Sequence, residues 1–156
     1  MTIQTQAEAF LSQSRIAVVG VSRKQGTGNA IFKALRKRGY EVVPVNPKAS
    51  EVDGEPCYPD LKSIPEGVDA AVLVTSPGVS EAVMRDCVEA GVSHVWMHHN
   101  ALFGAKNSSV SDAATTYGRD NGIDVIPGGC PLMFGDGADL GHRCMRWFLG
   151  RTHKLP

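Results

Sequence analysis

Residues 15–35, RIAVVGVSRKQGTGNAIFKAL, contain the pattern that decides the fold. An apolar run rich in β-branched residues breaks at Gly20 and gives way to a short polar loop. Apolar residues then return at helical spacing, at Ala30, Ile31, Ala34 and Leu35. This pattern predicts a strand, a glycine loop and a helix. A strand–loop–helix connection of this kind directs backbone N–H groups and the positive end of a helix dipole at one point, where a phosphate can bind.

Composition and charge restrict the class of protein. The chain has 156 residues, the length of one ordinary domain, and a formal net charge of zero, with 16 Lys+Arg against 16 Asp+Glu. This balance argues against a nucleic-acid-binding protein. The sequence shows neither a leader pattern nor an apolar run long enough to cross a bilayer, so we expect a soluble, cytoplasmic protein without membrane contact. We expect one domain over residues 1–156, with residues 1–14 as a helical extension, as a monomer or homodimer.

The cysteines and histidines show no metal-binding pattern. No C-x-x-C pair occurs, which predicts reduced thiols at Cys57, Cys87, Cys130 and Cys144 rather than a zinc site or a disulfide framework. The neighbours His98 and His99 would point to opposite faces of a strand, where they could not easily share one ion. We therefore expect no metal.

Strands and helices alternate along the rest of the chain. The sequence predicts strands at 40–46, 68–75, 93–98 and 123–127, and helices at 5–14, 79–90, 108–119 and 140–149. Pro44 falls inside a strand, which is tolerated mainly at a sheet edge or a bulge. Trp96 falls within another, where we expect core packing. The alternation predicts an α/β, Rossmann-like, doubly wound, mostly parallel five-stranded sheet with helices on both faces in three layers.

A doubly wound sheet binds its ligand outside the carboxyl ends of its strands. The candidate cofactor-binding residues are those at the predicted strand ends, together with the start of the first long helix: Gly20, Val21, Ser22, Arg23, Gly28, Asn46, Pro47, Lys48, Thr75, Ser76, Pro77, Met97 and His98. Cys130 follows the last strand at the same edge.

The glycine spacing and the residues at the end of the second strand narrow the class of phosphate-containing ligand that the loop could bind. A dinucleotide-binding fingerprint reads G-x-G-x-x-G, followed by an acidic residue at the end of the second strand. Gly26 and Gly28 come later than this pattern allows, and Asn46-Pro47-Lys48 stands where the acid would be. A lysine there favours a phosphorylated ribose. NAD is therefore disfavoured, while NADP and coenzyme A both remain open.

Five short motifs, in this order, resemble the stand-alone CoA-binding domain proteins related to the N-terminal domain of the succinyl-CoA synthetase α subunit. They are VGVSR at 19–23, GYEVVPVNP at 39–47, GEPCYPDL at 54–61, VDAAV at 68–72 and VWM at 95–97, within a resemblance that spans residues 15 to about 133. The resemblance implies that the first loop and Gly28 bind coenzyme A. It also implies that Asn46, Pro47 and Lys48 surround the adenosine phosphate and that Ser76 and Pro77 lie against the adenine or pantetheine. His98 stands where the family commonly has glutamine.

With this resemblance, the sequence predicts a non-catalytic carrier, sensor or regulatory module that binds coenzyme A or an acyl-CoA. Two alternatives stay open: an NADP-binding oxidoreductase-type domain, and the CoA-binding subunit of an acyl-CoA ligase that acts with a partner chain. Ser22 or Cys130 with His98 are the only candidates for a nucleophile and base, so we expect no enzyme activity. Cys130 is interpreted as an inert buried thiol, with a mixed disulfide to the thiol of coenzyme A as the alternative hypothesis.

Overall fold

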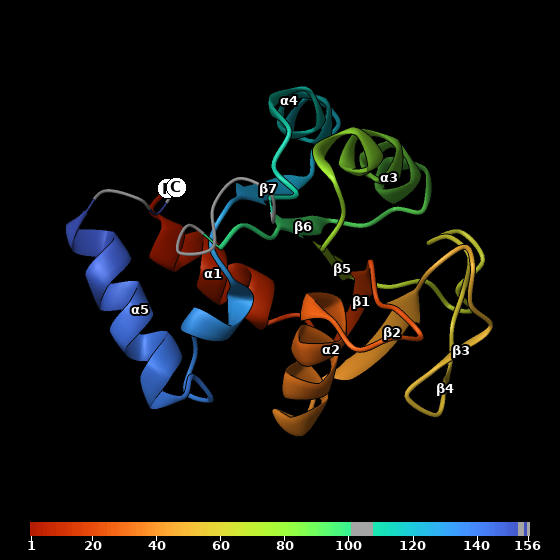
Figure 1. Ribbon diagram of the computed structural model, residues 1–156. Helices are drawn as coiled ribbons and strands as arrows, with labels where there is room; N and C mark the ends of the chain where they lie inside the picture. Colours follow the sequence, from red (N-terminus) through yellow and green to blue (C-terminus); the bar gives the residue numbers. More distant parts are fainter. Residues whose placement is uncertain (101–107, 153–154, 156) are drawn as a thin grey trace.

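The computed structural model describes residues 1–100, 108–152 and 155 (Figure 1). Five strands form one parallel sheet: β1 (Arg15–Val19), β2 (Glu41–Val45), β5 (Ala70–Leu73), β6 (His94–Met97) and β7 (Asp124–Pro127). Their order across the sheet is β2-β1-β5-β6-β7. The chain winds outward from β1 to β2, then returns to the other side of β1 at β5. The predicted doubly wound sheet is thereby confirmed, and its winding reverses between β1 and β5.

Helices cover both faces of the sheet, which confirms the three predicted layers (Figure 1). The helices are α1 (Ile3–Leu11), α2 (Thr27–Lys37), α3 (Pro77–Glu89), α4 (Asp112–Asp120) and α5 (Leu140–Arg151). One core cluster joins α1 and α2 to the sheet and includes Leu149 of α5 and the short 3₁₀ helix η2 (Pro131–Met133). A second cluster joins α3 and α4 to the opposite face. No helix in the described ranges is both long and apolar enough to span a membrane.

The predicted boundaries of the first and fourth helices are wrong by two to four residues, and local capping explains where both helices begin. The first helix begins at Ile3 rather than Thr5, since the Thr2 side chain accepts a hydrogen bond from the Thr5 N–H. It ends at Leu11. The fourth helix begins at Asp112 rather than Ser108, because Ser111 is its N-cap and Ser108 instead forms a β-bridge with His99.

Pro44 lies on β2, which is an edge strand, as predicted. Its carbonyl accepts a hydrogen bond from the Tyr58 N–H at 3.1 Å. The nitrogen and carbonyl of one strand residue face the same side, so the missing N–H of Pro44 faces this outer edge too. The proline therefore removes no hydrogen bond from the pairing of β2 with β1.

A small hairpin, β3 (Glu51–Val52) and β4 (Glu55–Pro56), follows the second strand. Asp53 and Gly54 turn the chain with φ values of 51° and 80°, which fits the predicted turn at this dipeptide. Two ion pairs join the hairpin to α2: Lys33 with Asp53 at 3.3 Å, and Arg36 with Glu55 at 2.7 Å. The hairpin is thus held along the side of α2.

Candidate functional site

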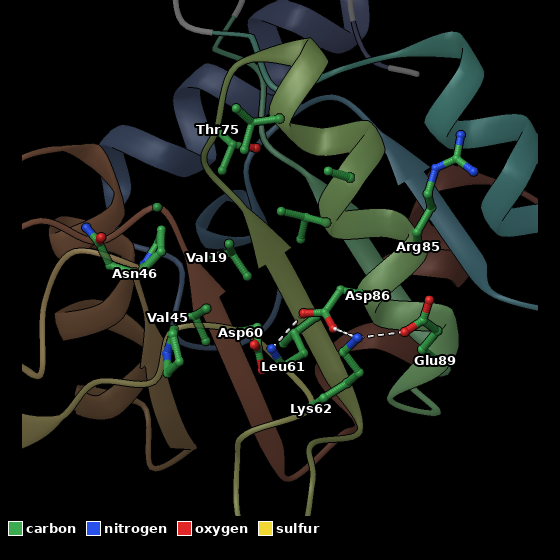
Figure 2. A pocket seen from close by; sticks show the side chains of 16 residues that line it. Val19, Val45, Asn46, Asp60, Leu61, Lys62, Thr75, Arg85, Asp86 and Glu89 are labelled. Carbon is green, nitrogen blue, oxygen red and sulfur yellow. Dashed lines mark hydrogen bonds and ion pairs between the residues drawn. The ribbon is translucent and has the colours of Figure 1, made fainter.

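A cavity of about 430 Å³ opens where β1, β2 and β5 end, beside the side of α3 that carries Val79, Ala82 and Asp86 (Figure 2). Its apolar lining comes from the strand ends and α3, mainly Val19, Val45, Val79, Ala82 and Val83. Charged side chains border it: Asp60, Lys62, Arg85, Asp86 and Glu89. Of the residues predicted from the sequence, it brings together Gly20, Asn46, Pro47 and Thr75. The volume and apolar lining suit a small organic ligand such as a nucleoside.

Two glycines bring the first strand, its loop and α2 into direct contact. Gly20 adopts φ +102°, and a Cβ there would lie 2.1 Å from the Val74 carbonyl oxygen. A Cβ at Gly28 would lie 2.5 Å from the Gly20 carbonyl oxygen. Both positions therefore require glycine, because the groups they would strike are rigid backbone. The helix N-terminus is held against the end of β1 as a result.

The two helices that begin at this edge lack side-chain caps. The N-cap residues Gly26 of α2 and Ser76 of α3 make no capping hydrogen bond, and neither helix has an acidic residue in its first turn. The side chains of Thr2, Ser111 and Asp139 do cap α1, α4 and α5. Both uncapped termini leave N–H groups and positive dipole ends at the carboxyl edge, where they favour an anion.

Asn46 links the ends of the first two strands. Its Nδ2 donates to the Val21 carbonyl at 2.6 Å, and its Oδ1 accepts from the Lys48 N–H at 2.7 Å. Pro47 and Lys48 are exposed at the mouth of the site. No carboxylate in the described part of the chain pairs with the Lys48 ammonium, so this cation is available to a ligand.

The other predicted site residues differ in exposure. Thr75 donates its N–H to Ser109 Oγ at 2.9 Å, and Ser76 and Pro77 are exposed where α3 begins. Val21 and Met97 are buried in opposite core clusters, so their side chains serve packing.

His98 is 3% exposed, and burial, with a smaller effect of the neighbouring His99, lowers its pKa to about 4. Its imidazole is therefore neutral at pH 7, and any contact it makes with a ligand involves the uncharged ring. No hydrogen bond in the described residues joins His98 to Ser22 or Cys130, the pairs considered as nucleophile and base.

Cys130 is buried in the core cluster on the α1–α2 face. Burial raises the pKa of its thiol to about 11, although nearby Arg38 opposes the shift. Little thiolate forms at neutral pH, which agrees with an inert buried thiol. The mixed disulfide with coenzyme A stays a prediction. All four cysteines are free, and the described residues contain no group of three potential metal ligands.

Sequence reasoning missed the wall of the cavity formed by α3 and residues 59–62. The Asp86 carboxylate accepts from the Leu61 N–H at 2.7 Å, and Lys62 pairs with Glu89 at 2.7 Å, as Figure 2 shows. Together these contacts fix the segment over the cavity. The only available signal was the helical spacing of Ala82, Asp86 and Glu89, which places them on one face of α3.

Comparison with known proteins found related sequences. A family model described as the CoA binding domain matches residues 14–136. The ADP-forming acetate–CoA ligase I subunit alpha of Pyrococcus furiosus is 36% identical over 137 residues, which is 82% of this chain and 29% of that protein. The ADP-forming acetate–CoA ligase I of Archaeoglobus fulgidus is 41% identical over 73 residues, 46% of this chain and 11% of that one. This chain thus spans less than a third of either ligase.

A solved structure, described as a hypothetical protein from Pyrococcus horikoshii OT3, has a similar fold with a TM-score of 0.74 at 27% identity. The match covers 84% of this chain and 87% of that one. The arrangement of strands and helices described above is therefore also found in a chain of similar extent.

Proposed function

Because the chain belongs to the CoA binding domain family, we propose that it binds coenzyme A or an acyl-CoA at the carboxyl edge of β1, β2 and β5. The main observation that supports this proposal is that the apolar cavity lies beside the loop from Gly20 to Gly28, because Gly20 itself lines the cavity. The uncapped start of α2 offers N–H groups to the diphosphate. The cavity of about 430 Å³ offers apolar surface to the adenosine.

We place the diphosphate at residues 22–28 and the adenosine between β2 and α3. Ser76 and Pro77, at the start of α3, flank the path of the pantetheine arm. The protein then acts as a carrier, sensor or regulatory module rather than as an enzyme. This role is supported by the neutral His98 and the buried Cys130, because no hydrogen bond among the described residues joins either of them to a nucleophile or base.

A second candidate function is that of a CoA-binding subunit of a ligase. It is favoured by the 36% identity to a ligase subunit alpha over 82% of this chain. In that case the acyl-activating chemistry would come from a partner chain. Co-purification with that chain, and CoA-dependent ligase activity of the complex alone, would distinguish this function from a free-standing sensor.

Thermal unfolding in the presence of nucleotides tests the proposed function. A ligand that binds only the folded state stabilises it by about 2.7 kcal/mol at a hundredfold excess over Kd. For a chain of this length the expected rise in Tm is about 5–10 °C. We expect this rise with coenzyme A and acetyl-CoA and none with NAD. A rise with NADP and none with coenzyme A would contradict the proposal and favour the oxidoreductase-type alternative.

Lys48 is expected to bind the ribose 3′-phosphate of the ligand. The Lys48→Ala variant should bind coenzyme A at least tenfold more weakly, because a charge-assisted hydrogen bond contributes about 1.5–3 kcal/mol. Its affinity for dephospho-coenzyme A should not change. Titration calorimetry with both ligands measures the difference. Lys37→Ala is the control, since Lys37 is an exposed lysine in the last turn of α2 and does not line the cavity. Equal weakening of both ligands by Lys48→Ala would refute this assignment.

A further inference from the structure

Asn29 is a polar side chain buried in the first turn of α2, with 1% of its surface exposed. Its amide faces the backbone of Ser22 in the glycine loop. Oδ1 accepts from the Ser22 N–H at 3.0 Å, and Nδ2 donates to the Ser22 carbonyl at 2.8 Å. Two reciprocal bonds between an amide and one loop residue fix that residue's orientation, and burial makes them costly to break.

The second proton of Asn29 Nδ2 is donated to Asp53 Oδ2 at 3.1 Å. Asp53 lies at the tip of the β3–β4 hairpin, where Gln25 donates to it at 3.3 Å and Lys33 pairs with it at 3.3 Å. The bond from Asn29 is the main cause that lowers the pKa of this carboxyl group, so it stays ionised at neutral pH. Because an ionised carboxylate can only accept hydrogen bonds, Asp53 requires the NH₂ group of the Asn29 amide to face it.

This arrangement restricts how the loop can receive a phosphate. The Ser22 N–H is already donated to Asn29, and the Lys24 N–H is donated to Ser22 Oγ at 3.1 Å. In the described residues the N–H groups of Arg23 and Gln25 have no acceptor. The anion must therefore be received by these groups and the first turn of α2, while the Ser22 hydroxyl keeps its own proton to donate.

The geometry points to Asn29 and Asp53 as positioning residues that hold the glycine loop in its binding shape before the ligand arrives. Asn29 acts on the loop directly, and Asp53 acts through Asn29. Lys33 neutralises the carboxylate, so the pair can hold the loop without repelling a diphosphate. This inference rests on the proposed function only for the identity of the ligand. The ordering of the free loop can be measured without one.

The test compares the whole chain with three variants. Asn29→Ala removes all three bonds and leaves a residue of high helix propensity. Asp53→Asn keeps an acceptor for Asn29 and tolerates the φ of 51° at this position. Glu55→Gln is the matched control, since Glu55 lies on the same hairpin but pairs with Arg36 of α2 rather than with Asn29.

In the absence of ligand, we expect Asn29→Ala to increase amide hydrogen exchange at least tenfold at Ser22, whose N–H is donated to Asn29, and at Lys24, whose N–H is donated to Ser22. We expect the same variant to bind coenzyme A at least tenfold more weakly, with unchanged affinity for adenosine 3′-phosphate, which lacks the diphosphate. The Asp53→Asn variant should show a smaller change in both measurements, and Glu55→Gln should show none.

Unchanged exchange in Asn29→Ala would overturn the positioning role. An equal loss of affinity for coenzyme A and adenosine 3′-phosphate would also overturn it, because it would indicate general damage to the site. Failure of the unmodified protein to bind coenzyme A would overturn the proposed function instead. The exchange measurement would still decide whether Asn29 orders the loop.

Discussion

Replacing Gly28 with alanine is expected to remove measurable coenzyme A binding and to destabilise the fold by about 1–3 kcal/mol. The new Cβ would lie 2.5 Å from the Gly20 carbonyl oxygen and 3.1 Å from the Val21 nitrogen. Both are backbone atoms, so no side-chain rotation can relieve the clash. The start of α2 would have to move away from β1, which would separate its N–H groups from the loop. Titration calorimetry and urea unfolding measure the two effects.

Gly26→Ala is the matched control in the same loop. A Cβ at Gly26 would meet no atom within 4 Å, and its φ of −166° is extended backbone that any residue adopts. We expect this variant to keep its stability within about 0.5 kcal/mol. If Gly26→Ala were as damaging as Gly28→Ala, general loop flexibility rather than close backbone approach would explain the role of the glycines.

The fold followed from the sequence because its strands are buried on both faces. Such strands form continuous apolar runs, as in β1 and β5, and the intervening helices show their own periodicity. The position of Pro44 was also informative, because a missing N–H is tolerated at a sheet edge and β2 is an edge strand. These are local signals that do not depend on distant contacts.

The details of the site depend on contacts between distant segments, which a sequence pattern does not contain. Asn29 is a polar residue in a helix's first turn, a position that usually faces water. Its burial depends on Asp53, which lies 24 positions later on the hairpin. Met97 is the opposite case, because it stands at a strand end near the site, yet the strand's pleat directs its side chain into the core. The strand ends predicted the edge of the sheet at which the cavity lies, but only some of the residues that line it.

Truncation of Trp96 to alanine is expected to cost about 3–5 kcal/mol of stability. Trp96 is fully buried, and its ring lies edge-on to Phe10 at 5.4 Å and tilted against Phe134 at 5.5 Å between ring centroids. Its Nε1 donates to the Gly128 carbonyl at 2.8 Å. Removal of the side chain would leave both a large cavity and a buried carbonyl without its donor. Urea unfolding followed by far-UV circular dichroism measures the loss.

Two further variants separate the contribution of Trp96 packing to stability from that of its hydrogen bond. Trp96→Phe keeps an aromatic ring but removes the donor, and should cost about 1–3 kcal/mol. Trp147→Ala is the control, since Trp147 is 63% exposed on α5 and its removal should change stability by no more than about 0.5 kcal/mol. Trp96 belongs to the core cluster on the α1–α2 face, whereas the cavity lies beside α3. The folded fraction of Trp96→Phe should therefore bind coenzyme A normally, and a loss of affinity equal to that of Gly28→Ala would show that packing on the α1–α2 face also holds the start of α2 in place.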